Sequence, residues 1–163
     1  MPICNPTDLK VHLQQGQRLL GLDVGTKTIG MALSDTRLVI ATPFDTIRRT
    51  RFRDDLARIR QEVEKQGVGD IVVGLPLALA GGEGPRAQGV RQFAKNLLAQ
   101  LDLPLIFWDE RFSTAAVERG MIEADITRKR RAQIVDRAAA AYILQGLLDR
   151  IARGAPPPVS GTP

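Results

Sequence analysis

The stretch RLLGLDVGTKTIGMALSD, residues 18–35, decides the fold of this 163-residue chain. Arg18–Leu22 and Thr28–Leu33 are apolar runs that read as strands, and the short segment between them carries one glycine, which favours a tight antiparallel hairpin. Gly25 can adopt the positive φ that such a turn often needs. Asp23 therefore ends a strand beside exposed backbone amides, where it either caps the turn or helps to hold a metal ion or a phosphate.

Beyond this hairpin the pattern predicts a third strand, followed by alternating helices and strands. Leu38–Phe44 is a short apolar run that completes an antiparallel meander. Spacing and composition indicate the other elements, which are a helix from Phe52 to a stop at Gly67, a buried strand at 70–76, a helix over Pro85–Gln100, a strand at 103–108, a short helix at 114–123 and a long helix from about Arg130 to Arg153. Helix-linked strands are expected to be parallel, with right-handed crossovers. The predicted fold is α/β, a mixed five-stranded sheet of three antiparallel strands followed by two parallel ones, with helices on both faces.

The composition is that of a globular protein with one domain, since 44% of the residues are hydrophobic and 25% are charged. The domain is expected to span residues 18–153. Residues 1–17 form a polar extension, and the Pro/Gly/Ser-rich residues 154–163 are expected to be disordered. No apolar run approaches the ~20 residues that cross a bilayer, and the start of the chain lacks a secretory pattern. A membrane partner is therefore not expected.

Charge and cysteine content narrow the class of partner. The net charge of +5 and the pI of about 10.0 favour a nucleic acid, although a basic surface can also serve solubility alone. The single cysteine, Cys4, fits a reducing cytoplasm. With one cysteine and one histidine the chain cannot form a Cys/His zinc site, so that carboxylates would have to hold any metal.

Acidic residues follow the first and last predicted strands and recur in the last helix. Asp23 ends the first strand, Asp109 and Glu110 end the last, and Asp136 lies about two turns into the long helix. Converging carboxylates make an oxygen site suited to Mg²⁺ or Mn²⁺. Each residue also has an ordinary explanation, as a turn cap, a solvated strand end or an ion-pair partner. The case for a metal site rests on their coincidence at one edge of the sheet.

Four motifs in this order carry a family resemblance. They are LGLDVGTKTIGMALSD at 20–35, VGLPLALAGGEGPRAQGVRQFAKNL at 73–97, DERFST at 109–114 and TRKRRAQIVDRAAAAYILQGLLD at 127–149. The chain resembles the YqgF family, also called RuvX, whose members are bacterial ribonuclease H-like proteins described both as Holliday junction resolvases and as pre-16S rRNA nucleases. The resemblance covers nearly all of the chain except its ends.

This resemblance implies a site and an activity. The family's catalytic, metal-binding acids match Asp23, Glu110 and Asp136, and Asp109 is a possible extra ligand. The implied reaction is metal-dependent hydrolysis of phosphodiester bonds with Mg²⁺ or Mn²⁺. The implied first substrate is the 5′ end of pre-16S rRNA in the cytoplasm, and a branched DNA junction is the alternative.

Basic residues beside these acids are expected to contact the nucleic acid. The candidate contacts are Arg128, Lys129, Arg130, Arg131, Lys27 and Arg111. Guanidinium groups bind phosphates through paired hydrogen bonds, which give affinity without reading sequence. A second cluster, TIRRTRFR at 46–53, is a weaker candidate because it lies further from the acids in the sequence. The alternative for both clusters is a solvated basic face.

Two other functions compete with a nuclease. The hairpin DVGTKT also resembles the phosphate-binding turn of the actin, heat-shock ATPase and sugar kinase superfamily, but those proteins need a second similar domain, for which this chain has no room. A non-catalytic ribosome-assembly factor that binds RNA is the other alternative. The sequence allows a monomer or a homodimer, and a junction resolvase is expected to be a dimer because its substrate is symmetric.

Overall fold

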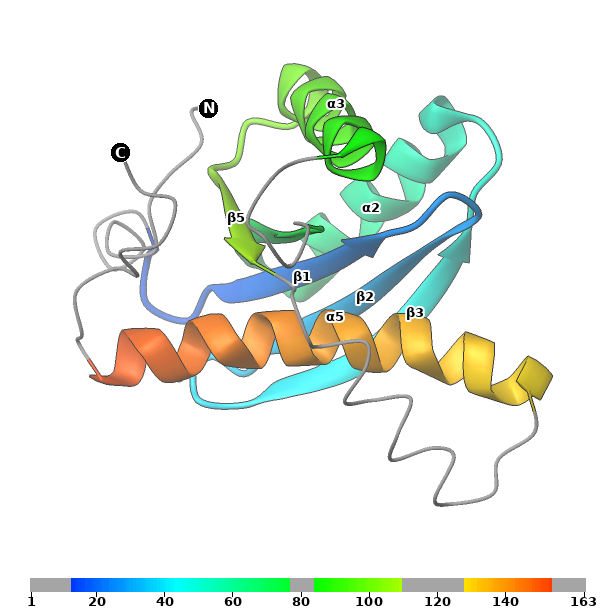
Figure 1. Ribbon diagram of the computed structural model, residues 1–163. Helices are drawn as coiled ribbons and strands as arrows, with labels where there is room; N and C mark the ends of the chain where they lie inside the picture. Colours follow the sequence, from blue (N-terminus) through cyan, green and yellow to red (C-terminus); the bar gives the residue numbers. More distant parts are fainter. Residues whose placement is uncertain (1–12, 77–83, 110–127, 154–163) are drawn as a thin grey trace.

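The computed structural model describes residues 13–76, 84–109 and 128–153, and of residues 128–136 only the backbone (Figure 1). Its elements are β1 (Arg18–Val24), β2 (Thr28–Ser34), β3 (Ala41–Arg48), α2 (Phe52–Gln66), β4 (Val68–Leu75), α3 (Pro85–Gln100), β5 (Leu105–Asp109) and α5 (Arg128–Arg153). The strands form one sheet in the order β3-β2-β1-β4-β5. Pairing is antiparallel between β1, β2 and β3 and parallel between β1, β4 and β5. The predicted mixed five-stranded sheet is confirmed.

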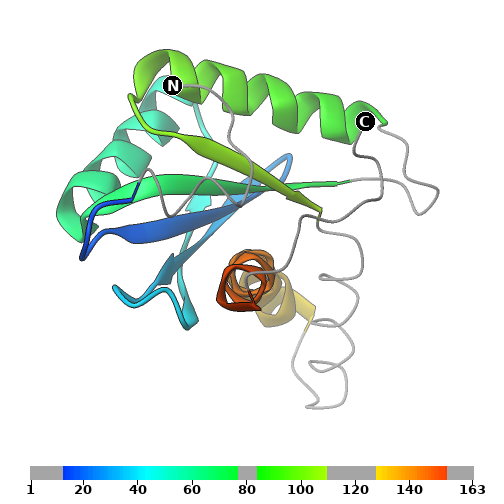
Figure 2. The same ribbon diagram turned by 90° about the vertical axis from the view of Figure 1, so that its left-hand side faces the viewer.

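The sheet separates two apolar cores. Helices α2 and α3 cover one face, and α5 lies across the other, where it contacts every strand (Figure 2). Side chains alternate between the faces, so that Leu20 and Leu22 enter the core under α2 and α3, whereas Leu19 enters the core under α5. Within the described residues, no helix is long and apolar enough to cross a membrane.

Several predicted boundaries are confirmed, because local chemistry sets them. Helix α2 ends where Gly67 adopts a left-handed φ of 66° and donates its N–H to the carbonyl of Val63. Helix α3 begins at Pro85, as expected for a residue that has no N–H to leave unpaired. The predicted short helix at 114–123, the tail at 154–163 and most of the N-terminal extension lie outside the described residues.

Strand β3 begins at Ala41, three residues later than the apolar run from Leu38 predicts. Leu38 has a positive φ of 60°, which interrupts an extended chain. The Asp35 carboxylate accepts hydrogen bonds from the N–H groups of Val39 at 2.7 Å and Ile40 at 3.0 Å. A side-chain acceptor thus holds this segment in a turn, despite its β-branched composition.

The glycine of the β1–β2 turn does not use the positive φ that its residue type allows. Gly25 is not among the described residues with positive φ. Its N–H donates to the Thr28 carbonyl at 2.8 Å, and a Cβ on Gly25 would lie 3.0 Å from that oxygen. A glycine is needed here because the turn closes tightly, and not because the backbone is left-handed.

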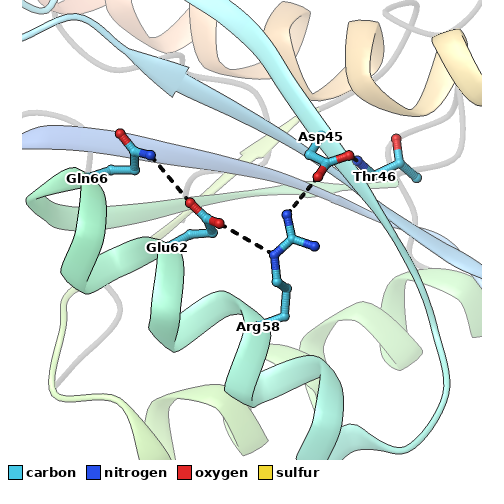
Figure 3. A network of polar contacts seen from close by, with 5 residues as sticks. All are labelled: Asp45, Thr46, Arg58, Glu62 and Gln66. Atoms are coloured by element: carbon cyan, nitrogen blue, oxygen red, sulfur yellow. Dashed lines mark hydrogen bonds and ion pairs between the residues drawn. The ribbon is translucent and has the colours of Figure 1, made fainter.

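The edge strand β3 is tied to α2 by a polar network (Figure 3). Arg58 donates to the Asp45 carboxylate at 2.6 Å and lies 3.5 Å from Glu62, which accepts a hydrogen bond from Gln66. The register between β2 and β3 shifts beside Asp45, leaving Phe44 as an extra residue that packs on the core under α2. The Arg58 hydrogen bond lowers the pKa of Asp45.

Candidate active site

Asp23 lies near the end of β1 on the face covered by α5. Its neighbours Leu22 and Val24 point into the opposite core, which fixes the side of the aspartate by alternation. The residue is only 8% exposed. It pairs with Gly30 in β2, and on the β4 side the register one residue past the Leu22–Val73 pair brings it beside Gly74. Glycines therefore lie beside this aspartate on both neighbouring strands, so neither strand places a Cβ next to it.

Helix α5 brings its N-terminal half over this end of the sheet. Gln145 accepts a hydrogen bond from the N–H of Ala41, which begins β3 at the end of the sheet where β1 also begins. Five residues earlier in the helix, the Ala140 carbonyl lies 3.1 Å from where a Cβ on Gly21 would be. The helix therefore runs antiparallel to β1 (Figure 1). The backbone of Asp136, one turn before Ala140, continues toward the strand end that carries the buried aspartate.

Small residues lie where α5 approaches the sheet closely. Ala139, Ala140 and Ile143 are buried, and Leu144 packs against the bare backbone of Gly21. The glycine was not singled out by sequence reasoning. Its signal was a glycine between two leucines in a buried strand, which often marks a close backbone approach.

Asp109 ends β5 at the same end of the sheet but belongs to the other face. It pairs with Leu75, the last residue of β4. In β5, Phe107 packs on the core under α2 and α3 and Trp108 on the core under α5. Alternation therefore assigns Asp109 to the side of Phe107, away from Asp23.

The other predicted site residues are described less completely. Glu110 and Arg111 lie outside the described residues, and Arg128, Lys129, Arg130, Arg131 and Asp136 are placed by their backbone in α5. Across the described ranges no group of three His, Cys, Asp or Glu side chains could hold a metal ion. The described part of the site is thus Asp23 with its two glycine neighbours and the helix above it.

Cations surround the hairpin at this end of the molecule. Lys27 is exposed in the turn, and Arg48 is exposed where β3 pairs with the start of β2. Arg49, the next residue, is half-buried instead, and its guanidinium donates to the Gly25 carbonyl at 2.7 Å. Sequence reasoning grouped these arginines as one basic cluster, whereas the structure separates an exposed cation from one bound to the hairpin.

A second buried carboxylate lies at the opposite end of the sheet. Asp70 pairs with Leu19, is 0% exposed, and neither of its oxygens has a hydrogen-bond partner in the described part of the chain. Burial raises the pKa of Asp70 to about 7. Because it is distant from Asp23 along the sheet, Asp70 takes no part in the candidate active site.

Comparisons with known proteins identify the family. The family model described as RuvX, Holliday junction resolvase, matches residues 17–150. A candidate pre-16S rRNA nuclease of Paramagnetospirillum magneticum is 60% identical over 149 residues, covering 91% of this chain and 96% of the relative. Another, from Rhodospirillum rubrum, is 52% identical over 157 residues, covering 96% and 98%.

Solved structures share the fold at low identity. Thermus thermophilus RuvC in complex with a Holliday junction substrate aligns with a TM-score of 0.52 at 13% identity, covering 83% of this chain and 96% of RuvC. The fowlpox virus resolvase bound to Holliday junction DNA aligns with a TM-score of 0.51 at 10% identity, covering 83% and 99%. These similarities support the ribonuclease H-like fold. Together with the family match, they lead to one conclusion: the chain belongs to the RuvX family.

Proposed function

We propose that this protein is a metal-dependent nuclease that hydrolyses phosphodiester bonds in structured nucleic acid, and that its substrate is the 5′ end of pre-16S rRNA in the cytoplasm. The observation that carries the proposal is the place of Asp23. This carboxylate is nearly buried at a strand end, has glycines on both neighbouring strands, and lies at the end of the sheet that the N-terminal half of α5 covers.

The residues present fit a divalent ion. An aspartate held at a sheet edge is a hard oxygen donor of the kind that Mg²⁺ and Mn²⁺ prefer. Asp23, Glu110 and Asp136 are the proposed ligands. Such ions, when bound, activate water and neutralise charge that develops on phosphate oxygens.

The chain's own residues would bind and orient the substrate. Lys27 and Arg48 are exposed at the end of the sheet that carries Asp23 and present cations to a phosphate backbone. The run Arg128–Arg131 begins α5, whose N-terminal half leads toward the same end of the sheet. We assign Asp109 no share in the ion held by Asp23, because alternation directs it to the other face.

Cleavage of a four-way DNA junction is the second candidate. The fold similarity to two resolvases that were solved with Holliday junctions favours it. A junction has two symmetric cleavage points, so this function requires a homodimer, whereas trimming an RNA end is possible for a monomer. Mass measurement in solution therefore complements the activity test.

The test uses two end-labelled substrates, a pre-16S rRNA 5′ segment and a four-way DNA junction. Each is incubated with Mg²⁺, Mn²⁺ or EDTA, and the proteins compared are wild type, Asp23→Asn and Asp102→Asn. Asp102 is an exposed aspartate between α3 and β5, so it is a matched control for the same chemical change. We expect metal-dependent cutting of the RNA by wild type and Asp102→Asn, and none by Asp23→Asn.

Two other outcomes would contradict the proposal in different ways. Cutting of the junction alone would show that the substrate is branched DNA and not pre-16S rRNA. Binding of both substrates without cutting, unchanged by Asp23→Asn, would leave a non-catalytic RNA-binding assembly factor.

A further inference from the structure

Arg49 makes three contacts that together fix the β1–β2 turn. Its backbone N–H donates to the carbonyl of Lys27 at 2.8 Å, and its guanidinium Nη1 donates to the carbonyl of Gly25 at 2.7 Å. The guanidinium carbon also lies 5.3 Å from the centre of the Phe93 ring in α3. Arg49 thus joins two carbonyls of the β1–β2 turn to α3, which covers the face of the sheet opposite to α5.

The aromatic surface under Arg49 is itself fixed. Phe93 is buried in the core, and its ring meets that of Phe52 edge-on at a centroid distance of 5.6 Å and an interplanar angle of 78°. Phe52 is the first residue of α2. The guanidinium therefore rests on a ring that two helices hold in place.

The turn that Arg49 holds begins two residues after Asp23. Gly25 is bonded on both sides, since its N–H donates to Thr28 and its carbonyl accepts from Arg49. A fixed Gly25 restricts the backbone of the strand end that carries Asp23, and a fixed Lys27 carbonyl restricts the residue expected to meet a phosphate. Small displacements of a reacting group reduce rates strongly, so such a restraint bears on turnover.

We propose that Arg49 is a positioning residue that holds the β1–β2 turn, and with it the orientation of Asp23, without contacting the substrate. Only the part of this inference that concerns cleavage kinetics rests on the proposed nuclease function. The adjacent Arg48 has the contrasting role, because it is exposed at the end of β3. The two neighbouring arginines are thereby separated into a structural clamp and a cation available to the nucleic acid.

The test compares Arg49→Met, Arg49→Lys and a charge-matched control, Arg60→Met. Methionine keeps an apolar stem but has no donor, whereas lysine keeps the charge and one bond to the Gly25 carbonyl. Arg60 is exposed on α2 and donates to the Gln100 carbonyl at the end of α3. Amide hydrogen exchange of residues 24–29 and steady-state cleavage are measured for each variant.

For Arg49→Met we expect exchange at Gly25 to be roughly tenfold faster, since a charge-assisted hydrogen bond is lost. We expect kcat to fall by about tenfold or more with KM nearly unchanged. Arg49→Lys should recover part of both effects, and Arg60→Met should match wild type in both.

If amide hydrogen exchange at Gly25 is unchanged in Arg49→Met, Arg49 does not hold the turn and the proposal is overturned. A raised KM with kcat preserved would instead make Arg49 a phosphate contact. If the wild type cleaves neither substrate, the proposed function fails, and the exchange data still decide whether Arg49 holds the turn.

Discussion

Leu144 of α5 packs directly on the backbone of Gly21 in β1, so closely that a Cβ on Gly21 would lie 3.0 Å from the Cβ of Leu144. The Ala140 carbonyl is nearly as close, at 3.1 Å. This contact sets the distance between the helix and the sheet midway along β1. The same helix carries Asp136 toward the strand end of Asp23, so the spacing at Gly21 also sets the spacing across the proposed site.

Replacing Gly21 by alanine should destabilise the protein by about 1–3 kcal/mol, because the added methyl group must displace α5 or the sheet. The measurement is urea denaturation followed by the fluorescence of Trp108, the single tryptophan of the chain, which packs on the core under α5. Gly89→Ala in α3 is the matched control. Its Cβ meets nothing within 4 Å, so alanine should stabilise that helix by about 0.5–1 kcal/mol. Equal effects of the two substitutions would disprove the close approach.

Asp70→Asn should remove a pH-dependent loss of stability. Asp70 has a pKa of about 7 in the folded protein against an ordinary value of 3.8. Below the ordinary value it is neutral in both states and costs nothing. Between the two values only the unfolded chain ionises, so the wild type loses stability as the pH rises toward about 7, by about 1.4 kcal/mol for each pKa unit.

The measurement for Asp70 is the free energy of unfolding at about pH 4 and about pH 8. The advantage of Asp70→Asn over wild type should grow with pH and then level off. Asp102→Asn, the same chemical change at an exposed position, is the matched control. A constant difference between Asp70→Asn and wild type at both pH values would mean that Asp70 is ionised in the folded state.

Asp109→Asn should cleave at close to the wild-type rate, whereas Asp23→Asn should be inactive. The physical reason is that the two carboxylates lie at the same end of one sheet but on its opposite faces. The comparison is made at several Mg²⁺ concentrations, so that a weaker ion affinity is not mistaken for a lost group. A loss in Asp109→Asn that higher Mg²⁺ restores would show that Asp109 shares the ion.

The Asp45–Arg58 pair should contribute modestly to stability. Its side chains are 47% and 36% exposed, and exposed ion pairs are worth about 0.2–1 kcal/mol. A double-mutant cycle with Asp45→Ala and Arg58→Ala measures the coupling energy. Since Arg58 lowers the pKa of Asp45, this contribution is present above the ordinary carboxylate range and is lost as the pH falls through the lowered pKa. Coupling that persists in strong acid would contradict this assignment.

Much of the fold could be predicted from the sequence because hydrophobic period and end signals agree. Gly67 and Pro85 mark helix ends by their own backbone chemistry, and both boundaries are as expected. The predicted start of β3 was wrong because the Asp35 carboxylate accepts hydrogen bonds from two amides of an apolar segment. A pattern of residue propensities does not include such a contact. The reason for a glycine at position 25 could not be predicted, because a tight contact and a left-handed φ both favour glycine.

The site could be predicted only in part. Asp23 was found because a carboxylate at the end of an apolar run is a local signal. Its setting depends on Gly30 and Gly74, which become its neighbours only through the strand register. In the sequence Arg49 cannot be distinguished from the other arginines of TIRRTRFR. Its hydrogen bond to the Gly25 carbonyl, 24 residues earlier, depends on tertiary structure. The roles proposed for Glu110 and Asp136 remain predictions.

Helix α5 is synthesised after all five strands, although it contacts every one of them on one face of their sheet. A nascent chain that ends before Arg128 therefore leaves Leu19, Val72 and Ile106 as bare apolar surface, which favours binding to chaperones during translation. The aspartates proposed to work together are separated by most of the polypeptide. The proposed site therefore requires that the enzyme gains its activity only after translation has passed the final helix.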